Sequence, residues 1–476
     1  MARSASTLTS KPVDPTTQEM LVLAMLSYRA YHSLRPGEVQ LARLYGAVED
    51  GLATLEQLDE SWELVWGPAA YRAPFTTFDE NVMYVARDRR TPDRYAVVVR
   101  GTNPVSASDW LFGDLWTGVL APWEFGPAAQ REGAAISLST ALGLNVLLHM
   151  HATGPRPGPV ARIWRLADDE VGDLVRSTTR FVLRPFGGLA AVALRRLRFK
   201  LRADLRELKY LREHAVSRDP EERIDTLLAF RNSTAARRIR RRLVDAEGRL
   251  DDNAHRELLR LMEGSFRLRT RLAPGATLFE FLRAAVSEAS GPVEVVVTGH
   301  SKGGALAPTL ALALAQCQGS EHVHRPQRWD PDERATVHCY AYAGPTAGNA
   351  AFADLSDHVI GANCHRVANR LDMVPHAWMT RPSPRSKGLF IDDLPTLYAA
   401  PVHRIRSLDL LAKTVINDVA PLEYRHVGKH VTILDGEVDP ERRLYFEQAA
   451  YQHMEAYLEM LDLDDMGLVD FVSPLR

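Results

Sequence analysis

Residues 293–304 read Val-Glu-Val-Val-Val-Thr-Gly-His-Ser-Lys-Gly-Gly and join a predicted strand, a sharp turn and the start of a helix. The valine run is typical of a strand buried on both faces, and the alanine- and leucine-rich segment that follows is typical of a helix. Between them, residues 299–303 fit the G-x-S-x-G pattern of a nucleophile elbow. Such a turn needs glycines because strand and helix nearly touch, and it lifts the serine hydroxyl above the sheet. The stretch therefore predicts an α/β fold in which Ser301 is a nucleophile.

The elbow needs an acid and a histidine as partners, and in this type of fold both follow the serine along the chain. Residues 337–345 and 366–376 read as further strand segments of the sheet, and the second ends in an acidic loop. That loop holds Asp372, the candidate acid. His453 stands where a C-terminal helix is expected to begin, and an imidazole at such a junction can reach back over the sheet. His453 is the candidate base.

Three other histidines compete for the role of base. His426 and His430 flank a strand-like segment, residues 427–434, and are expected to be structural, while His376 closely follows the candidate acid. A serine hydroxyl is a poor nucleophile at neutral pH, so the base must take its proton during attack and return it to the leaving alcohol. The acid fixes the tautomer of the imidazole and stabilises the imidazolium. These residue types predict acyl transfer through a Ser-Asp-His triad.

Further motifs accompany the elbow in a fixed order. They are Ala96-Val97-Val98-Val99-Arg100-Gly101-Thr102, Asp109-Trp110, Asp114-Leu115, Gly344-Pro345-Thr346-Ala347-Gly348-Asn349, Leu371-Asp372-Met373-Val374-Pro375, Tyr424-Arg425-His426-Val427-Gly428, and His453 with Glu455 and Tyr457-Leu458. With these motifs the chain resembles the class 3 lipases, the fungal-type lipase family of the α/β-hydrolases, over roughly residues 75–145 and 275–462. Several motifs in register are far more specific than any one of them.

The resemblance implies a role for each matching position. The implied triad is Ser301, Asp372 and His453, and the implied oxyanion hole is Thr102 with the backbone N–H of Lys302. Trp110, Leu111 and Phe112 are either the apolar tip of a lid or ordinary core. The family commonly has leucine after the nucleophile, whereas the charge of Lys302 favours an anionic substrate headgroup. The chemistry needs no cofactor, and no metal-ligand cluster is apparent in the sequence.

The composition fits one α/β-hydrolase domain with an insertion. The chain has 476 residues, of which 46% are hydrophobic, enough for a large core and an extra module. Cys317, Cys339 and Cys364 lack C-x-x-C spacing, which argues against a disulfide framework or a zinc site and suits a reducing compartment. The polar N-terminus lacks an apolar run before a cleavage site, and no stretch reaches the roughly 18 apolar residues of a membrane span. We therefore expect a cytoplasmic protein, with export by a signal-independent route as the alternative.

Charge is distributed unevenly along the chain. Residues 150–272 contain 28 Lys and Arg against 17 Asp and Glu, so this segment carries +11 within a total of −2, and the rest carries −13. The segment is helical in pattern, with an apolar run at 186–194 and arginine-rich runs at 194–202 and 237–242. Such a sequence suits a membrane interface, with arginines on lipid phosphates. The alternatives are a helical cap whose arginines pair with acidic residues of the chain, and nucleic-acid binding, which the scarcity of aromatics among the basic residues disfavours.

Together these features predict an α/β-hydrolase fold, with a mostly parallel sheet flanked by helices and a helical insertion. The expected parts are residues 1–149 with the oxyanion strand and candidate lid, the basic insertion at 150–272, and residues 273–476 with the elbow, acid and histidine. The expected function is a serine carboxylic-ester hydrolase, a lipase or phospholipase, that acts on lipid esters through an acyl-enzyme. The alternative is a catalytically idle scaffold that docks on anionic membranes through the insertion. No nucleic-acid partner and no cofactor are expected.

Overall fold

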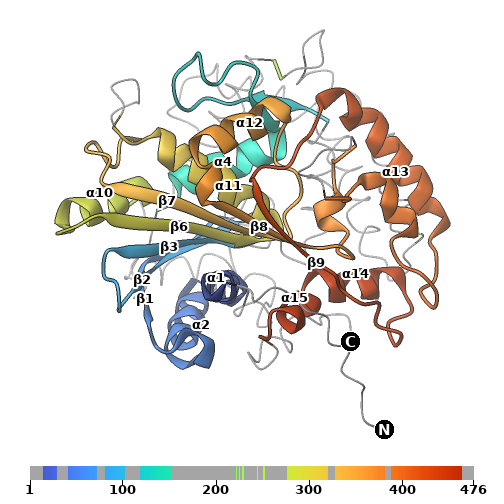
Figure 1. The fold of residues 1–476 in the computed structure, drawn as a ribbon, viewed down its shortest axis with the longest axis horizontal. Coiled ribbons are helices and arrows are strands. Elements are labelled where there is room, and N and C mark those ends of the chain that lie inside the picture. Colours follow the sequence, from blue (N-terminus) through green and yellow to red (C-terminus); the bar gives the residue numbers. More distant parts are fainter. Residues whose placement is uncertain are drawn as a thin grey trace, which may run out of the picture.

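The computed structural model describes residues 14–28, 41–71, 81–101, 118–151, 276–319, 327–380 and 387–463, together with Glu221, Asp225, Leu228, Ala229, Val244, Leu250 and Asp251. These residues form a seven-stranded sheet in the order β1-β2-β3-β6-β7-β8-β9 (Figure 1). β1, β2 and β3 pair antiparallel, and β3, β6, β7, β8 and β9 pair parallel. The mostly parallel sheet predicted from the sequence is confirmed.

The strands of this sheet include the segments that the sequence predicts. They are β1 (Trp62–Tyr71), β2 (Asn81–Asp88), β3 (Arg94–Val99), β6 (Val293–His300), β7 (Ala335–Tyr342), β8 (Cys364–Asn369) and β9 (His430–Leu434). A separate two-stranded sheet pairs β4 (Leu120–Pro122) with β5 (Ala135–Ser137). β6, β7 and β8 lie where strands are predicted around the elbow and before the acid, and β9 lies within the strand-like segment 427–434.

Side chains along the central strands alternate between two hydrophobic cores. On β3, Val97 and Val99 belong to one core and Ala96 and Val98 to the other, and all four are completely buried. β6 alternates in the same way. A strand that is covered on both faces needs apolar residues at every position, which explains the unbroken valine run before the elbow.

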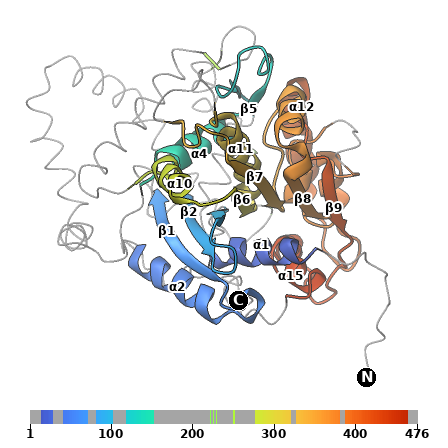
Figure 2. The same cartoon turned by 60° about the vertical axis from the view of Figure 1, so that its left-hand side comes forward.

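Helices cover both faces of the sheet, as Figure 2 shows. One face carries α4 (Leu138–His149), α10 (Leu278–Glu288), α11 (Lys302–Gln316) and α12 (Ala350–Val359), and the other carries α1 (Pro15–Leu26), α2 (Leu41–Thr54) and α15 (Glu455–Met460). The remaining helical elements are α13 (Arg406–Val419), α14 (Tyr445–His453) and the 3-10 turns η2 (Glu56–Leu58), η4 (Gly361–Asn363), η5 (Val374–His376), η6 (Ile391–Thr396) and η7 (Ala420–Leu422). In such layered sheets the functional site lies at the carboxyl ends of the parallel strands.

Helix α1 is buried against the sheet and hydrogen-bonded to it. Residues 20–26 are at most 1% exposed. Tyr84, Thr298 and Tyr342, on β2, β6 and β7, donate their hydroxyls to main-chain carbonyls of α1 over 2.6, 3.1 and 2.5 Å. Side-chain hydroxyls of three strands thus hold one face of α1 in a fixed register on the sheet.

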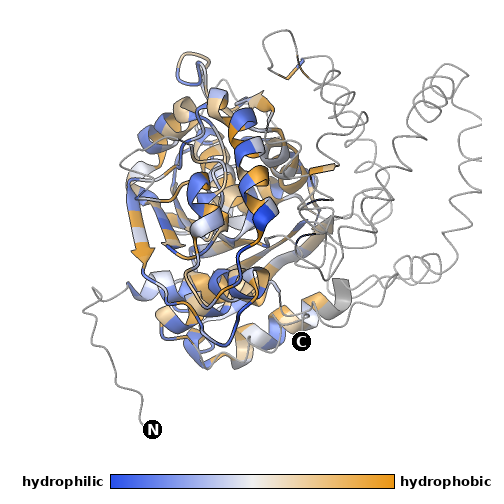
Figure 3. Ribbon diagram, turned by 90° about the vertical axis from the view of Figure 1, so that its right-hand side faces the viewer, coloured by the Kyte–Doolittle hydropathy of each residue, from blue (hydrophilic) through white to orange (hydrophobic). Residues whose placement is uncertain are grey.

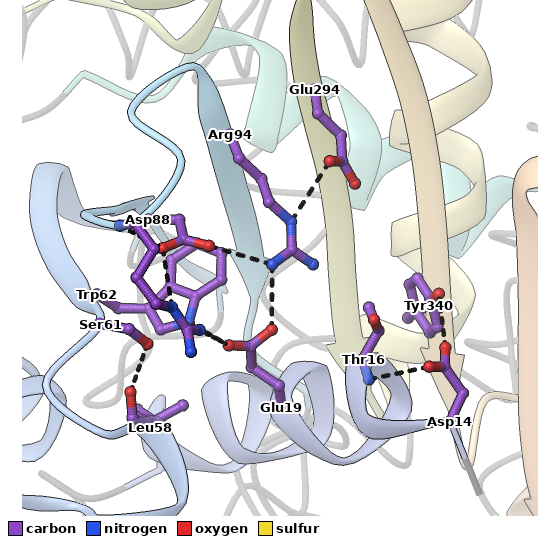
Figure 4. Close-up of polar contacts among 11 residues, drawn as sticks. Asp14, Thr16, Glu19, Leu58, Ser61, Trp62, Asp88, Arg94, Glu294 and Tyr340 are labelled. Atoms are coloured by element: carbon purple, nitrogen blue, oxygen red, sulfur yellow. Dashed lines mark hydrogen bonds and ion pairs between the residues drawn. The ribbon is translucent and has the colours of Figure 1, made fainter.

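An ion-pair network holds the outer side of α1 (Figure 4). Glu19 of α1 pairs with Arg94 of β3 over 3.2 Å and accepts a hydrogen bond from the indole of Trp62 over 2.8 Å. Arg94 also pairs with Asp88 over 3.3 Å and with Glu294 over 3.5 Å, and it lies over the ring of Trp62. Because Arg94 and Asp88 are largely buried, screening by salt is weak and the network adds to the docking of α1.

Helix α13 lies at the side of the sheet that faces the viewer in Figure 3, where hydrophilic and hydrophobic residues mix along the helices. Most of the predicted insertion, residues 150–272, lies outside the described residues, including its arginine-rich runs. Within it, the carboxylate of Glu221 accepts hydrogen bonds from the backbone N–H groups of Arg406 and Ser407 over 2.7 and 3.2 Å. Leu228 packs in a hydrophobic cluster with residues of α13 and α14. Two described residues of the insertion therefore contact the C-terminal part of the chain.

Two further expectations concern disulfide bonds and membrane-spanning segments. Cys317, Cys339 and Cys364 are buried and free. Within the described ranges, no helix has the length and apolar character needed to cross a bilayer.

Candidate active site

Ser301 occupies a strained turn between β6 and α11. β6 ends at His300, α11 begins at Lys302, and Ser301 between them has φ 62° and ψ −127°. A non-glycine residue rarely adopts positive φ, and such strain is held in place only by its surroundings. Here the N–H of Ser301 donates to Tyr342 O over 3.0 Å, and Ser301 O accepts from Gly304 N over 2.8 Å. The fold therefore fixes the backbone from which the serine hydroxyl projects.

The two glycines of the elbow lie where strand and helix meet. A Cβ at Gly299 would lie 2.5 Å from the carbonyl oxygen of Gly303, and a Cβ at Gly303 would lie 2.3 Å from the carbonyl oxygen of Val99. Both distances are far below van der Waals contact, so neither position has room for a side chain. The close approach of strand and helix that the sequence predicts is present.

Asp372 and His453 form a hydrogen-bonded pair. Nδ1 of His453 lies 2.9 Å from Oδ2 of Asp372, whose side chain is completely buried, while the His453 side chain is 14% exposed. The same oxygen accepts the hydroxyl of Tyr457 over 3.0 Å, and Oδ1 accepts the N–H of Val374 over 3.0 Å. Three donors therefore fix the carboxylate, and the carboxylate in turn orients the imidazole.

The expected position of His453 at the start of a helix is wrong. His453 is the last residue of α14, Met454 breaks the helix with φ −125° and ψ −75°, and α15 begins at Glu455. Residues 445–453 contain alanines and glutamines that favour a helix, so the helix extends to the histidine. His453 lies at a junction between two helices.

A hydrogen-bond network around this junction was not predicted from the sequence. Asn369, at the end of β8, donates its side-chain amide to the carbonyl and side-chain oxygens of Gln452 over 3.0 and 2.7 Å. Its backbone N–H donates to the hydroxyl of Tyr457 over 2.8 Å. The Gln452 amide donates to Glu437 O over 2.6 Å. Because the helix breaks after His453, no helical spacing relates Tyr457 to the base, although the lipase motif contains both residues.

The competing histidines make other contacts. His426 is 2% exposed, and its Nε2 lies 2.9 Å from Pro375 O. Burial and the nearby cation of Arg366 hold the pKa of His426 well below its usual range. The ring nitrogens of His376 each lie 3.0 Å from a main-chain carbonyl oxygen, and the exposed His430 stacks on the ring of His365. Of the four histidines, the structure places His453 on the acid.

The structure describes only some of the residues predicted for the oxyanion hole and the lid. A Cβ at Gly101, just after β3, would lie 2.8 Å from Cβ of Ser301, so the end of β3 adjoins Ser301. Thr102 follows directly but lies outside the described residues, as do Trp110, Leu111 and Phe112. Lys302 is the first residue of α11, and the N–H groups of a first helical turn point out along the helix axis. In the part of the chain that the structure describes, no group of three His, Cys, Asp or Glu residues is placed to hold a metal ion.

Known proteins resemble this chain in sequence over one segment and in fold over most of its length. The model of the class 3 lipase family matches residues 228–381, which include the elbow and Asp372. The solved structure of M37 lipase is 25% identical, and the match covers 96% of this chain and 95% of that chain with a TM-score of 0.61. The chain thus resembles the class 3 lipases over these residues, and its overall fold is similar to that of a solved lipase. Its α/β-hydrolase fold is thereby confirmed.

The chain is also similar to a plant enzyme. Phospholipase A1-Igamma2, chloroplastic, of Arabidopsis thaliana is 28% identical over 170 residues, or 36% of this chain. The matched part spans about a quarter, 26%, of the plant protein. The names of these two similar proteins are those of a phospholipase and a lipase. His453 lies beyond the residues that the family model matches, so its assignment depends on the geometry around Asp372.

Proposed function

We propose that the chain is a serine carboxylic-ester hydrolase that acts on lipid esters, with Ser301 as nucleophile, His453 as base and Asp372 as acid. The observation that carries the proposal is the 2.9 Å hydrogen bond between His453 and the buried Asp372. In the same fold, the turn between β6 and α11 holds Ser301 in a strained backbone conformation. Serine, histidine and acid follow one another along the chain in the order of α/β-hydrolases. A binding scaffold has no need of this constellation.

The mechanism follows from the chemistry of the three side chains. Nδ1 of His453 donates to Asp372, so its Nε2 carries no proton in the neutral ring and can accept the proton of Ser301. The serine oxygen then forms a bond to the ester carbonyl carbon, and the carbonyl π electrons move to the oxygen. When the intermediate collapses, the ester C–O bond breaks and His453 returns the proton to the leaving alcohol. Water attacks the acyl-enzyme in the same way and releases the acid.

The negative charge on the intermediate needs donors at fixed positions. Within the proposal, these are the backbone N–H of Lys302, at the positive end of α11, and Thr102, which follows Gly101 beside the nucleophile. Loss of one such donor typically raises the barrier by about 3 kcal/mol. The close approach of Gly101 to Ser301 and the place of Lys302 at the start of α11 support this assignment.

The substrate class within the proposal is a lipid ester, of a glyceride or a phospholipid. The similarity to a phospholipase A1 and to M37 lipase supports both. Lys302 adds a cation one residue from the nucleophile, and a cation at this place favours an anionic headgroup. Residues 110–112 are the proposed apolar lid tip, and residues 150–272 are the proposed insertion between the two parts of the hydrolase domain.

A substrate panel tests the proposal. The purified protein is assayed on p-nitrophenyl esters of graded chain length, on a triglyceride emulsion, and on vesicles of neutral and anionic phospholipid. Ser301→Ala is expected to abolish all hydrolysis. Ser356→Ala is the matched control, because Ser356 is also buried, on α12, and its hydroxyl has no hydrogen-bond partner among the described residues. Unchanged hydrolysis in a folded Ser301→Ala protein contradicts the proposal.

The second candidate function is a catalytically idle protein that docks on anionic membranes. Its motivation is the +11 charge of residues 150–272 against −13 in the rest of the chain. The outcome that favours it is binding to anionic vesicles with no hydrolysis of any substrate in the panel.

A further inference from the structure

The ring of His300 lies between the N-terminal helix and the proposed base. His300 is the elbow residue before Ser301 and is completely buried. Its Nε2 lies 2.8 Å from the main-chain oxygen of His453, and its Nδ1 lies 3.2 Å from the hydroxyl of Tyr28. The rings of His300 and His453 are 4.6 Å apart at 44°. One residue adjacent to the nucleophile therefore touches both the backbone and the ring of the base.

The partners of His300 define its protonation. A carbonyl oxygen only accepts, so Nε2 of His300 carries the hydrogen and donates to His453 O. Burial, together with the neighbouring His453, holds the pKa of His300 well below its usual range, so the ring is neutral and Nδ1 is an acceptor. The hydroxyl of Tyr28 supplies the donor, and burial raises the pKa of Tyr28, which keeps this hydroxyl protonated. The same hydroxyl also lies 3.4 Å from His300 O.

The accepting carbonyl belongs to the residue where a helix ends. The last carbonyls of a helix have no N–H partner within it and need donors from elsewhere. α14 ends at His453, and the ring of His300 caps its final carbonyl. The side chain of the residue next to Ser301 is thus hydrogen-bonded to the backbone of the proposed base. Movement of His300 would shift the proposed base relative to both Ser301 and Asp372.

Tyr28 is held in place through helix α1, which is itself fixed on the sheet. It follows the end of α1, its N–H donates to Met25 O over 3.0 Å, and the ring is 5% exposed. The ion pairs of Glu19 in Figure 4 and the hydroxyls of Tyr84, Thr298 and Tyr342 fix the helix on the sheet. A Cβ at Gly101 would lie 2.1 Å from the Tyr28 hydroxyl and 2.8 Å from Cβ of Ser301. The hydroxyl therefore lies in the layer of atoms directly behind the nucleophile.

We propose that Tyr28 and His300 are positioning residues, which set the place of His453 through its main-chain carbonyl and its ring. The inference rests on the proposed role of His453 as base. It assigns a part in catalysis to the N-terminal helix, 272 residues away from the elbow in sequence. A neutral His300 is also required because a second positive ring 4.6 Å away would oppose the imidazolium that forms on His453.

The test compares two tyrosines that lose the same hydroxyl. Tyr28→Phe leaves Nδ1 of His300 without its donor, and we expect kcat on a soluble short-chain ester to fall about fivefold, as for the loss of one hydrogen bond, with KM unchanged. Tyr445→Phe is the matched control, because its buried hydroxyl also donates to a main-chain carbonyl, Leu394 O over 2.6 Å, at the opposite end of α14 from His453. We expect Tyr445→Phe to lower Tm and leave kcat at the wild-type value. Equal kcat values for Tyr28→Phe and wild type, or equal losses in both variants, overturn the proposal.

A second pair of variants addresses the donor on His300. His300→Gln keeps an N–H that can reach the carbonyl of His453, whereas His300→Leu has similar volume and no donor. We expect Gln to retain more kcat than Leu in proteins of comparable Tm. The reverse order contradicts the proposal.

A spectroscopic measurement separates this inference from the proposed function. In the resting protein labelled with ¹⁵N-histidine, His300 is expected to show a neutral ring with the proton on Nε2 from pH 5 to 8, and Tyr28→Phe is expected to shift its Nδ1 signal. A protonated ring or an unmoved Nδ1 signal overturns the positioning role even in an active enzyme. Lack of esterase activity in the wild type instead contradicts the role of His453 as base, and the positioning role with it.

Discussion

His453 donates Nδ1–H to Asp372 over 2.9 Å, and that carboxylate is completely buried. The bond fixes which ring nitrogen of His453 carries the proton, because the neutral imidazole has a single one. An amide in place of the carboxylate presents an N–H as readily as an oxygen. The proposed catalysis therefore depends on an acceptor at this position.

Asp372→Asn is expected to lower kcat by a factor of about 10⁴, the loss that follows when the wrong tautomer of a triad histidine is favoured. The fold is expected to persist, because an amide has the size of the carboxylate. The assay is hydrolysis of a soluble short-chain ester beside a Tm measurement. Asp393→Asn is the control, since Asp393 lies 3.7 Å from another histidine, His376, and is half-exposed. Wild-type kcat in Asp372→Asn would rule out the acid assigned here.

Histidine substitutions separate the base from the structural rings. His453→Ala is expected to cost several orders of magnitude in kcat, because the base is removed. His426→Ala is expected to lower Tm with little change in kcat of the folded fraction, because its ring is buried and lies against Pro375 O. Kinetics and thermal unfolding of both variants provide the check. If His426→Ala abolishes chemistry in a stable protein while His453→Ala does not, the assignment is wrong.

The stability of the protein is expected to fall as the pH drops below about 6.5, the usual pKa of histidine. The folded-state pKa values of His300 and His426 are both lowered, chiefly by burial, so below that pH the unfolded chain binds protons that the folded protein excludes. Each such histidine contributes a slope of about 1.4 kcal/mol per pH unit, with the stabilisation fully present above pH 6.5 and lost on acidification. Urea unfolding at pH 5 to 8 measures the slope.

One variant assigns part of that slope to a single residue. His426→Gln is expected to flatten the pH dependence, because it removes a buried histidine whose pKa is lowered in the folded protein. An identical slope in His426→Gln and wild type excludes this histidine as a source of the pH dependence.

The basic insertion gives a prediction about membranes. If residues 150–272 anchor the protein at an interface, it binds anionic vesicles more tightly than neutral ones, because each arginine near the surface contributes about 1 kcal/mol. The attraction decays within a Debye length, so binding weakens as salt rises. Replacement of Arg195, Arg196 and Arg198 by glutamine is then expected to reduce hydrolysis of vesicle-borne substrate and to spare a soluble ester.

The control for that experiment is a variant that loses three arginines outside residues 150–272. Glutamine at the exposed positions Arg89, Arg404 and Arg443 changes the total charge equally without touching the insertion. Co-sedimentation that is equal on neutral and anionic lipid and indifferent to salt favours the helical cap instead.

The elbow could be predicted from the sequence because its constraints are local. A buried strand, two glycines without room for Cβ and a following helix occupy consecutive positions, and the structure contains each of them at β6 and α11. Asp372 could be found from its place after a strand. The sheet follows from the same apolar strands, which alternate between two cores.

The surroundings of His453 could not be predicted, for physical reasons. No proline or glycine marks the break at Met454. The last carbonyl of the helix is instead hydrogen-bonded to His300, a tertiary contact that the local sequence does not encode. Tyr28 and His300 meet only through the packing of α1 on the sheet, which no spacing along the chain encodes. Asn369 and Gln452 likewise meet across 83 positions of sequence.

The most direct measurement is the site of covalent labelling by a fluorophosphonate, read by mass spectrometry of the intact protein and its peptides. Such a reagent phosphonylates a serine that a nearby base has activated: the serine oxygen bonds to phosphorus and fluoride leaves. We predict one adduct per chain, on Ser301, that Ser301→Ala removes and that His453→Ala slows by orders of magnitude. An adduct on another residue, or labelling that persists in a folded Ser301→Ala protein, would contradict Ser301 as the nucleophile.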